Sequence, residues 1–513
     1  MTKPASINSP YAQLLSSVRH RPSEVQGRSL ELEADADRGR VLSSAPFRRL
    51  QNKAQVFSLE SNAAVRSRLT HSLEVSSIGR LITQHAISSF TDNELSALGI
   101  RDNERALLTF VDTACLLHDL GNPPFGHFGE IAICDWFHEQ KDLKPGEIGG
   151  PTEQKWNKYS ADFKYFDGNP QGFRIVTKLQ PREEIGDLFG LNLTATTLAA
   201  TLKYPWNSDS IGEGYGADTR KKCGYFRTEE KVVKWVYESL GLLFGRRHPL
   251  VYLMEAADDI AYCVSDIEDG IEKGLVRAPA FAESMLKSLE DTQLLRSSEE
   301  DARKIINALY LLKTPVRERG GIKVERLTPM QDFRSAVIRY LAKRAGTAFY
   351  ALHAKILDGT APSLLSSTEG AVLLEGLKHF AETDLYGSVI VRNREITAQA
   401  VLSGLLAAYK SLMQCDKHRF EKALSGARRD DDGKPIAEDS SLIARISRKY
   451  LAVYKEEVRQ LEADNRNDPG TVRVLEKIYR IRLIIDYIAG MTDEFAMQSF
   501  KLISGVEINP FRM

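Results

Sequence analysis

Apolar residues recur at helical spacing along most of this chain. In residues 64–89 they return every three or four positions, which places them on one face of an amphipathic helix. Residues 106–120, ALLTFVDTACLLHDL, are apolar almost all round, as in a buried helix, and the pattern stops at Gly121. Residues 248–274 repeat the long apolar pattern. The first half of the chain is therefore expected to contain long, largely buried helices.

The second half of the chain continues the helical period. It predicts five further helices, at residues 301–312, 333–352, 396–413, 441–462 and 471–491. Alternation of apolar and polar positions is rare, and GGIKVERLTP (320–329) is expected to form a small hairpin or an extended crossing. Loops are predicted where glycine, proline and charge mix without a period, at residues 139–157, 207–224 and 425–441. The predicted fold class is mainly α.

Composition is that of an ordinary globular protein and excludes few functions. The 69 Lys and Arg balance 69 Asp and Glu, so a site for a polyanion must be local. No apolar run reaches the roughly 18 residues of a membrane span, and MTKPASINSPYAQL lacks the apolar core of a signal peptide. The five cysteines are scattered and odd in number. We therefore expect a cytoplasmic protein with reduced thiols and no membrane partner.

Residues 115–130, CLLHDLGNPPFGHFGE, concentrate side chains that can bind a metal. His118 and Asp119 are adjacent, so on a helix they project about 100° apart and both can approach one ion. His71 and Asp258 lie on two other predicted helices, and together the four groups suit Mn, Fe, Zn, Co or Mg with positions left for water and substrate. The alternative is that the histidines are hydrogen-bonded core residues and the aspartates a solvated edge.

The same stretch also carries a candidate acid–base pair. His127 and Glu130 are three residues apart, a spacing at which a carboxylate can fix the tautomer of an imidazole and support its charged form. Pro123 and Pro124 stiffen the approach to the pair. Two alternatives stay open, in which His127 caps the next helix or ligates a second metal.

Polar residues form a stripe on the predicted helix of residues 248–274. Asp258, Tyr262 and Asp266 recur at every fourth position, and we expect them to run from the metal along a substrate. A solvated face is the alternative, and it is the expectation for Asp259 and Glu268.

The order and spacing of these residues resemble a known superfamily. His71 and His118 are 47 positions apart, and Asp119 and Asp258 are 139 apart, which resembles the H…HD…D pattern of the HD-domain phosphohydrolases. Six blocks in family order across most of the chain resemble the bacterial deoxyguanosine triphosphate triphosphohydrolases more closely. They are residues 37–57, 66–75, 118–130, 166–172, 254–269 and 486–493.

The resemblance implies a metal site and a catalytic pair. The implied metal ligands are His71, His118, Asp119 and Asp258, and the implied cofactor is Mg²⁺ or Mn²⁺, with Co²⁺ as a further candidate. His127 and Glu130 are implied to transfer a proton or to position the attacking water, and the resemblance leaves open whether His127 serves the water or the leaving oxygen.

A triphosphate carries about four negative charges and needs Arg or Lys donors. By resemblance the phosphate contacts match Arg68, Lys203 and Tyr204, and Gln55 matches a position that reads the sugar 3′-hydroxyl. The implied substrate-binding residues are Gln55, Arg68, Asn122, Lys203, Tyr204, Tyr262 and Asp266. Further basic candidates are Arg48, Arg49, Lys53, Arg66, Lys221 and Lys222.

The activity that the resemblance implies is hydrolysis of dGTP, and of other dNTPs, to deoxynucleoside and inorganic tripolyphosphate by attack of water at the α-phosphate. No GxxxxGK[ST] motif is present, so a P-loop is not expected. Two alternatives are kept: another HD-domain nucleotide phosphohydrolase, and a non-catalytic oligomer that binds nucleotide or single-stranded DNA.

The resemblance further implies an organisation and partners. Residues 1–290 are expected to form an HD-domain core, with its motifs at about 64–270, and residues 291–513 a C-terminal helical region that completes the core. A homo-oligomer is expected, a hexamer built as a trimer of dimers, with subunit contacts from residues 391–406 and 486–493. Single-stranded DNA is an expected modulator.

Overall fold

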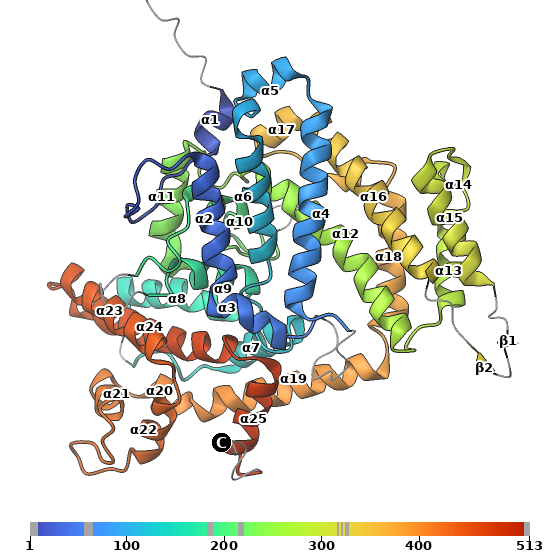
Figure 1. Cartoon of the computed structure of the whole chain (residues 1–513). Helices are drawn as coiled ribbons and strands as arrows, with labels where there is room; N and C mark the ends of the chain where they lie inside the picture. The colour runs from blue at the N-terminus through green and yellow to red at the C-terminus, as the bar shows by residue number, and fades with distance from the viewer. Residues whose placement is uncertain are drawn as a thin grey trace, which may run out of the picture.

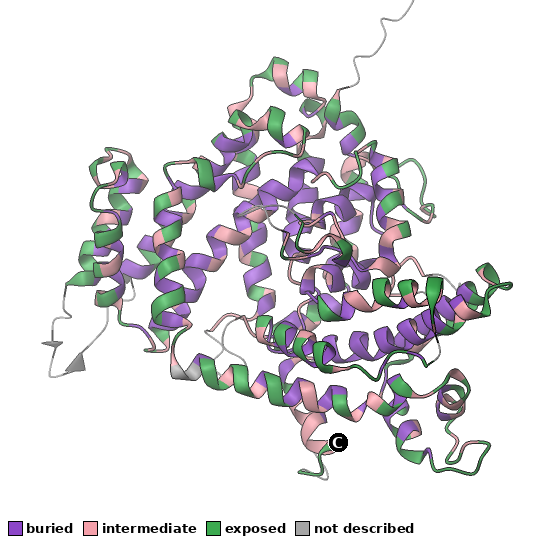
Figure 2. Ribbon diagram, turned by 180° about the vertical axis from the view of Figure 1, so that it is seen from behind, coloured by how far each residue is buried: buried purple, intermediate pink, exposed green. Residues whose placement is uncertain are grey.

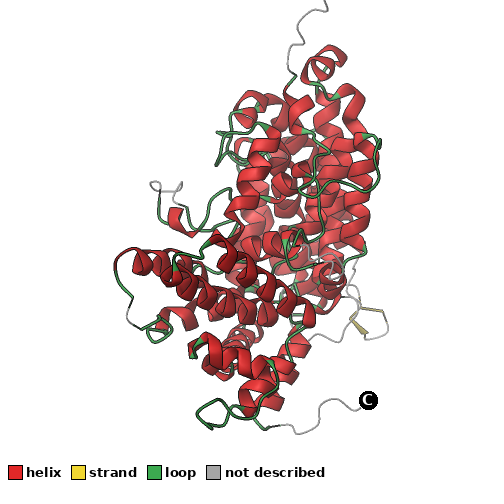
Figure 3. Ribbon diagram, turned by 90° about the vertical axis from the view of Figure 1, so that its left-hand side faces the viewer, coloured by secondary structure: helices red, strands yellow, loops and turns green. Residues whose placement is uncertain are grey.

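The computed structural model of this protein describes residues 9–55, 65–146, 148–181, 188–213, 220–314, 318–319, 322–323 and 328–506. Over these residues it is built almost entirely of helices (Figure 3). The predicted mainly α fold is confirmed. Within the described ranges, the helices all lack either the length or the apolar composition that crossing a membrane would require.

The helices of the first half carry the predicted site residues. In chain order they are α1 (Pro10–Leu14), α2 (Leu30–Leu42), α3 (Ala45–Arg49), η1 (Leu50–Asn52), α4 (Arg68–Ser89), α5 (Asp92–Leu98), η2 (Arg101–Asn103), α6 (Glu104–Leu117), α7 (His127–Glu139), α8 (Gly150–Lys164), α9 (Gly168–Thr177), α10 (Ala195–Thr201), η4 (Ser208–Ser210), η6 (Arg227–Glu229), α11 (Glu230–Leu240) and α12 (Pro249–Glu272).

The second half adds helices that cover and extend this core. They are α13 (Ala278–Ser288), α14 (Gln293–Arg296), α15 (Glu300–Lys313), α16 (Thr328–Ala351), α17 (His353–Leu357), η7 (Leu365–Ser367), α18 (Ala371–Phe380), η8 (Ala381–Leu385), α19 (Val389–Ala408), α20 (Lys410–Gln414), α21 (Lys417–Leu424), α22 (Ala437–Ala444), α23 (Arg448–Asp464), α24 (Pro469–Ala489) and α25 (Asp493–Ile503).

Helix α4 lies in the centre of the molecule, where it packs against α6, α12 and α16 (Figure 1). Its approach to α6 is close at Gly79, where a Cβ atom would lie 2.6 Å from Sγ of Cys115. A glycine lets two backbones approach where a larger side chain would collide. This packing brings the start of α4 to the end of α6, and therefore His71 to His118.

A second core surrounds α24, whose residues 474–489 are almost all buried (Figure 2). Arg174 of α9 is buried beside it and donates to three acids, at 2.9 Å to Asp486, 3.1 Å to Glu457 and 2.8 Å to Glu229. A buried cation is tolerated when acids surround and hydrogen-bond it. The network ties α9 to α23 and α24.

Two predicted loops are shorter than expected. Residues 150–157 belong to α8, because Pro151 suits the first turn of a helix and Trp156 is buried in the core. The loop predicted at 425–441 ends at Ile436, since α22 begins at Ala437. Of the loop at 207–224, residues 214–219 lie outside the described residues; the others contain only the short turn η4.

The helix predicted over residues 441–462 is two helices, α22 and α23, which part around Ser447. Ser447 has extended rather than helical backbone, with φ −54° and ψ 135°, so it interrupts the helical period that the sequence carries through it.

The structure contains one small hairpin among its described residues. Its strands are β1 (Glu318–Arg319) and β2 (Ile322–Lys323), paired antiparallel. The sequence placed a hairpin at 320–329, whereas the observed one starts two residues earlier and α16 already begins at Thr328. Residues 320, 321 and 324–327 lie outside the described part of the chain.

Candidate metal centre and acid–base pair

His118 follows the last residue of α6 and has a fixed orientation. Its Nδ1 donates a hydrogen bond to the carbonyl of Cys115, one turn earlier, at 2.7 Å. A hydrogen bond at one ring nitrogen directs the lone pair of the other nitrogen away from it. The Nε2 of His118 is buried and has no hydrogen-bond partner among the described residues, so it is available to a ligand.

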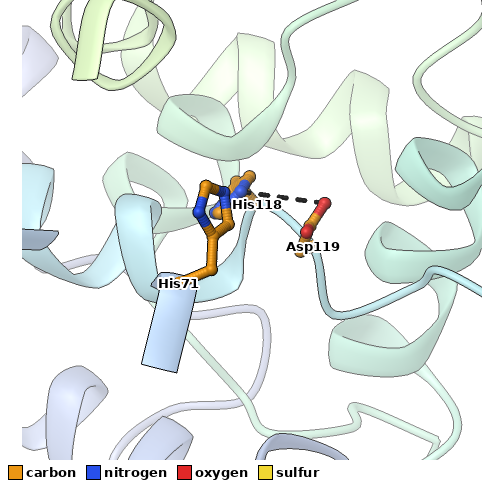
Figure 4. Close-up of side chains that lie close together, drawn as sticks. All are labelled: His71, His118 and Asp119. Carbon is orange, nitrogen blue, oxygen red and sulfur yellow. Dashed lines mark ion pairs between the residues drawn. The ribbon is translucent and has the colours of Figure 1, made fainter. Parts of the chain in front are cut away.

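The four predicted ligand residues come together in the structure. His71, His118 and Asp119 each offer a ligand atom within 4.8 Å of the others (Figure 4). From α12, Oδ1 of Asp258 lies 3.4 Å from Nε2 of His71 and 3.3 Å from Nε2 of His118. Residues separated by nearly two hundred positions thus meet at one point.

The charges of this cluster are strongly coupled. Burial alone would lower the pKa of His118, but Asp119 and Asp258 outweigh it and raise that pKa to about 9. Burial opposes ionisation of Asp258 as well, yet His118, His71 and Lys203 hold the pKa of its carboxyl well below the usual range. Both acids are therefore ionised at neutral pH.

This donor set fits a divalent cation of intermediate hardness. Two imidazole nitrogens and two carboxylates are ligands that Mn, Fe, Co and Zn accept, and Mg accepts the oxygens. The Nε2 atom of His118 has no hydrogen-bond partner among the described residues, and such an ion would supply one by coordination. A bound cation would also displace the proton that the two acids otherwise hold on His118.

The chain between Asp119 and His127 makes a strained turn. Phe125 has φ +64° and Gly126 has φ +58°, so two successive residues are left-handed. Glycine adopts this conformation freely, while phenylalanine adopts it at a cost. Helix α7 begins immediately afterwards at His127.

His127 and Glu130 form the predicted contact. Nδ1 of His127 lies 2.9 Å from Oε2 of Glu130, and the imidazole side chain is 69% exposed while the carboxylate is 9% exposed. The other oxygen, Oε1, accepts a hydrogen bond from the backbone N–H of Gly168 at 2.8 Å. That N–H belongs to the first residue of α9, a position that favours an anion. The carboxylate is thus held from two sides.

Gly168 is required by this arrangement. A Cβ atom there would lie 2.1 Å from Oδ1 of Asn122 and 3.0 Å from Oε1 of Glu130. Oδ1 of Asp119 in turn accepts from Nδ2 of Asn122 at 2.6 Å, so the crowding would reach the metal cluster as well.

We expect Gly168→Ala to lower kcat by about ten- to 100-fold, because a displacement of Glu130 by an ångström misplaces His127. The free energy of unfolding should fall by about 1–3 kcal/mol, as for other overpacked sites. Steady-state kinetics and thermal melts measure both effects. Gly39→Ala in α2 is the control, since a Cβ there meets nothing within 4 Å, and equal kinetics for the two variants would contradict the prediction.

A pocket of about 500 Å³ opens beside these groups. It is lined by eleven of the predicted residues, which are Gln55, Arg68, His118, Asp119, Asn122, His127, Glu130, Lys203, Tyr204, Asp258 and Tyr262. His71 does not line the pocket, but its Nε2 lies 3.4 Å from Oδ1 of the lining residue Asp258. The sequence did not single out the lining residues Asn169, Thr201, Phe128 and Tyr386, although Asn169 falls inside the block at 166–172.

Asp266 is connected to the pocket through Tyr386. Its carboxylate is buried and accepts a hydrogen bond from the Tyr386 hydroxyl at 2.6 Å. Tyr386 also stacks on Tyr262, with ring centroids 6.3 Å apart. Burial raises the pKa of Asp266 to about 7, partly offset by the bond from Tyr386.

The solvated face expected for Asp259 and Glu268 is wrong. Asp259 lines the pocket and pairs with Lys378 at 3.3 Å. Glu268 pairs with Arg66 at 2.5 Å and with Arg334 at 2.9 Å. The later helices that supply Lys378 and Arg334 pack along α12, which a single helical period cannot reveal.

Three cationic side chains line the pocket. Arg68 donates to Asp119 at 2.5 Å, Lys203 lies 3.9 Å from Asp258, and Lys222 pairs with Asp167 at 3.0 Å. Lys53 does not line the pocket; it is buried, and burial together with Arg49 lowers its pKa to about 7. The pocket therefore offers positive charge on the side of the metal cluster.

Comparison with known proteins covers nearly the whole chain. It is 32% identical over 506 residues to the "Probable deoxyguanosinetriphosphate triphosphohydrolase" of Pseudomonas aeruginosa, across 92% of this chain and 93% of that protein. It is 32% identical over 502 residues to the deoxyguanosinetriphosphate triphosphohydrolase of Yersinia enterocolitica, across 92% and 94%. Residues 444–502, which contain α23 and α24, match a family described as a phosphohydrolase-associated domain.

Proposed function

Because the chain belongs to the deoxyguanosinetriphosphate triphosphohydrolase family, we propose that it hydrolyses dGTP to deoxyguanosine and inorganic tripolyphosphate. The observation that carries the proposal is the cluster of His71, His118, Asp119 and Asp258 beside a pocket that also holds cations and an imidazole–carboxylate pair. A pocket of about 500 Å³ is of the size that small-molecule sites have.

We propose that the four residues of the cluster are the metal ligands. A divalent cation there would supply Lewis acidity, polarising the α-phosphate and making water a stronger nucleophile at neutral pH. The ion proposed is Mg²⁺ or Mn²⁺, with Co²⁺ as a third candidate. Arg68 supports the set from outside, since its guanidinium keeps Asp119 ionised and oriented.

Substrate binding is proposed for the residues that line the pocket. Arg68, Lys203 and Lys222 would neutralise the phosphates, and Lys222 was one of several basic candidates in the sequence. Tyr204 and Asn122 would complete the phosphate side. These side chains can hold the β- and γ-phosphates as charge moves onto the leaving tripolyphosphate.

The nucleoside is proposed to lie on the other side of the pocket. Oε1 of Gln55 is buried and lacks a hydrogen-bond partner within the described ranges, so it can accept from a sugar hydroxyl. Tyr262 and Tyr386 offer apolar ring surface, and Asp266 orients Tyr386. A ring packed against C2′ of the sugar leaves no room for a ribose hydroxyl, which would select deoxynucleotides.

His127 is proposed to move the proton. Glu130 holds Nδ1, which leaves Nε2 to exchange a proton with the attacking water or with the 5′-oxygen that departs. Glu130 stabilises the imidazolium in either role. Gly168 and the start of α9 keep this carboxylate in place.

Product analysis tests the proposed function. Purified protein with dGTP and Mg²⁺ or Mn²⁺ should give tripolyphosphate as the first phosphorus product in a ³¹P NMR time course. Orthophosphate or pyrophosphate appearing first would indicate another HD-domain phosphohydrolase. Binding of dGTP without turnover in either metal would indicate the non-catalytic oligomer. The same assay with the other dNTPs defines the substrate range.

We further propose the assembly that the family resemblance implies, a homo-oligomer arranged as a trimer of dimers, with single-stranded DNA as a modulator and the cytoplasm as its location. Helix α19 supports a subunit contact at residues 391–406, because Ile396 is 68% exposed there. Residues 486–493 do not offer such a surface, since all but Thr492 are buried within the chain. Sedimentation velocity measures the assembly.

A further inference from the structure

We propose that Asp493 is a positioning residue of the active site, which holds the backbone of Phe125 in the left-handed conformation that presents His127 to the pocket. The inference rests on the proposed function. It gives a chemical role to residues 486–493, one of the six blocks that resemble the family. Asp493 is the first residue of α25, in the phosphohydrolase-associated domain.

Both oxygens of Asp493 bind backbone amides of the active site. Oδ1 accepts from the N–H of Phe125 at 3.0 Å, and Oδ2 accepts from the N–H of Ala54 at 3.2 Å. Ala54 directly precedes Gln55, which lines the pocket on the proposed sugar side. The aspartate is 3% exposed, so water does not compete for these bonds. One side chain therefore fixes two walls of the pocket.

Phe125 needs such a restraint. A non-glycine residue with φ near +64° is sparsely populated, and it persists only where its surroundings hold it. The ring of Phe125 is buried, at 5% exposed, and its N–H is the group that Asp493 binds. Two residues later the chain enters α7 at His127, so rotation at Phe125 would swing the imidazole away.

Lys53 links the same turn to the C-terminal region. Nζ of Lys53 donates to the carbonyl of Asn122 at 2.6 Å and to the carbonyl of Ala489 at 2.9 Å. The turn between Asp119 and His127 is thus held at both ends from α24 and α25. The proposed metal ligands His118 and Asp119 directly follow α6 and precede these bonds in the chain, so neither is bonded to Asp493.

Asp493→Asn is the variant that tests this role. Asparagine keeps the size of the side chain but offers one acceptor oxygen, and its NH₂ group would face one of the two backbone N–H donors. We expect kcat to fall about ten- to 100-fold and KM for dGTP to rise by a smaller factor through Ala54 and Gln55, with the affinity for Mn²⁺ changed by less than about two-fold. Hydrogen–deuterium exchange of a peptide covering residues 120–128 should become faster.

Thr492→Ala is the matched control. The Thr492 hydroxyl caps α25 by accepting from the N–H of Phe495 at 3.3 Å, and it does not contact Phe125 or Ala54. Loss of this cap should lower the melting temperature and leave kcat and the exchange of residues 120–128 unchanged. If Thr492→Ala reproduces the kinetics of Asp493→Asn, the role of Asp493 is structural and the proposal is overturned.

A double-mutant cycle with His127 shows whether Asp493 acts through that residue. In a His127→Ala background, Asp493→Asn should cost little further kcat, since the group that it positions is gone. A full additional loss in that background would overturn the proposal. The exchange measurement needs no turnover, so it tests Asp493 even if the protein fails to hydrolyse dGTP, and unchanged exchange at residues 120–128 would overturn the proposal on its own.

Discussion

Asp258→Ala is expected to lower kcat/KM for dGTP by about 10³-fold or more, because a metal contributes several kcal/mol of transition-state stabilisation and each 1.4 kcal/mol is a factor of ten. Oδ1 of Asp258 lies within 3.4 Å of Nε2 of both His71 and His118, so it contacts both imidazoles of the cluster. Its removal should also abolish tight Mn²⁺ binding, which calorimetric titration measures directly.

Glu268→Gln is the matched control for this experiment. Glu268 lies on α12 like Asp258, but it pairs with Arg66 and Arg334 and does not line the pocket. It should keep wild-type Mn²⁺ affinity and kcat. Unchanged Mn²⁺ binding in Asp258→Ala, or full hydrolysis of dGTP, would mean that the cluster of His71, His118, Asp119 and Asp258 is not the metal centre.

His127→Ala is expected to lower kcat by about 10²–10⁴-fold, the usual contribution of a positioned acid–base group. Mn²⁺ affinity should stay within about two-fold of the wild type, because the imidazole pairs with Glu130 and is not part of the metal cluster. Stability should change little, since the side chain is 69% exposed. Rapid-quench kinetics measure kcat, and Mn²⁺ titration measures the affinity for the metal, so the two effects are separated.

His138→Ala provides the control for His127. It lies on the last turn of the same helix, α7. Its ring packs edge to face with that of Tyr165, with the ring centroids 6.2 Å apart. Its kinetics should match the wild type. A parallel loss of kcat and Mn²⁺ affinity in His127→Ala would instead place His127 among the ligands of a second metal, the alternative that the sequence pattern leaves open.

The reaction centre could be predicted from sequence because its residues carry recognisable chemistry at fixed local spacing. His118 and Asp119 are neighbours in the chain, and His127 and Glu130 are one turn apart on α7, so these pairs lie close together for local reasons. Asp258 could be recognised because it is a charged residue on α12, a helix that is otherwise mostly apolar. The structure brings these side chains together as predicted, whereas their roles as ligands and proton donors stay predictions.

Other parts of the site depend on packing that local patterns do not express. Tyr386 enters the pocket from the segment between η8 and α19, more than a hundred positions beyond Asp266. In the sequence it cannot be told from an ordinary core tyrosine. The solvated position expected for Asp259 is wrong for the same reason, because its partner Lys378 lies on the later helix α18. The start of α8 at Gly150 was missed because its glycines and charges resemble a loop.

The bond between Phe125 and Asp493 spans 368 positions, so the turn before His127 is closed by α25, near the C-terminal end of the described residues. Such a bond closes a long loop, which costs more conformational entropy than a local contact does. A chain shortened before α25 would keep the residues at the proposed metal centre but lose the side chain that holds this turn.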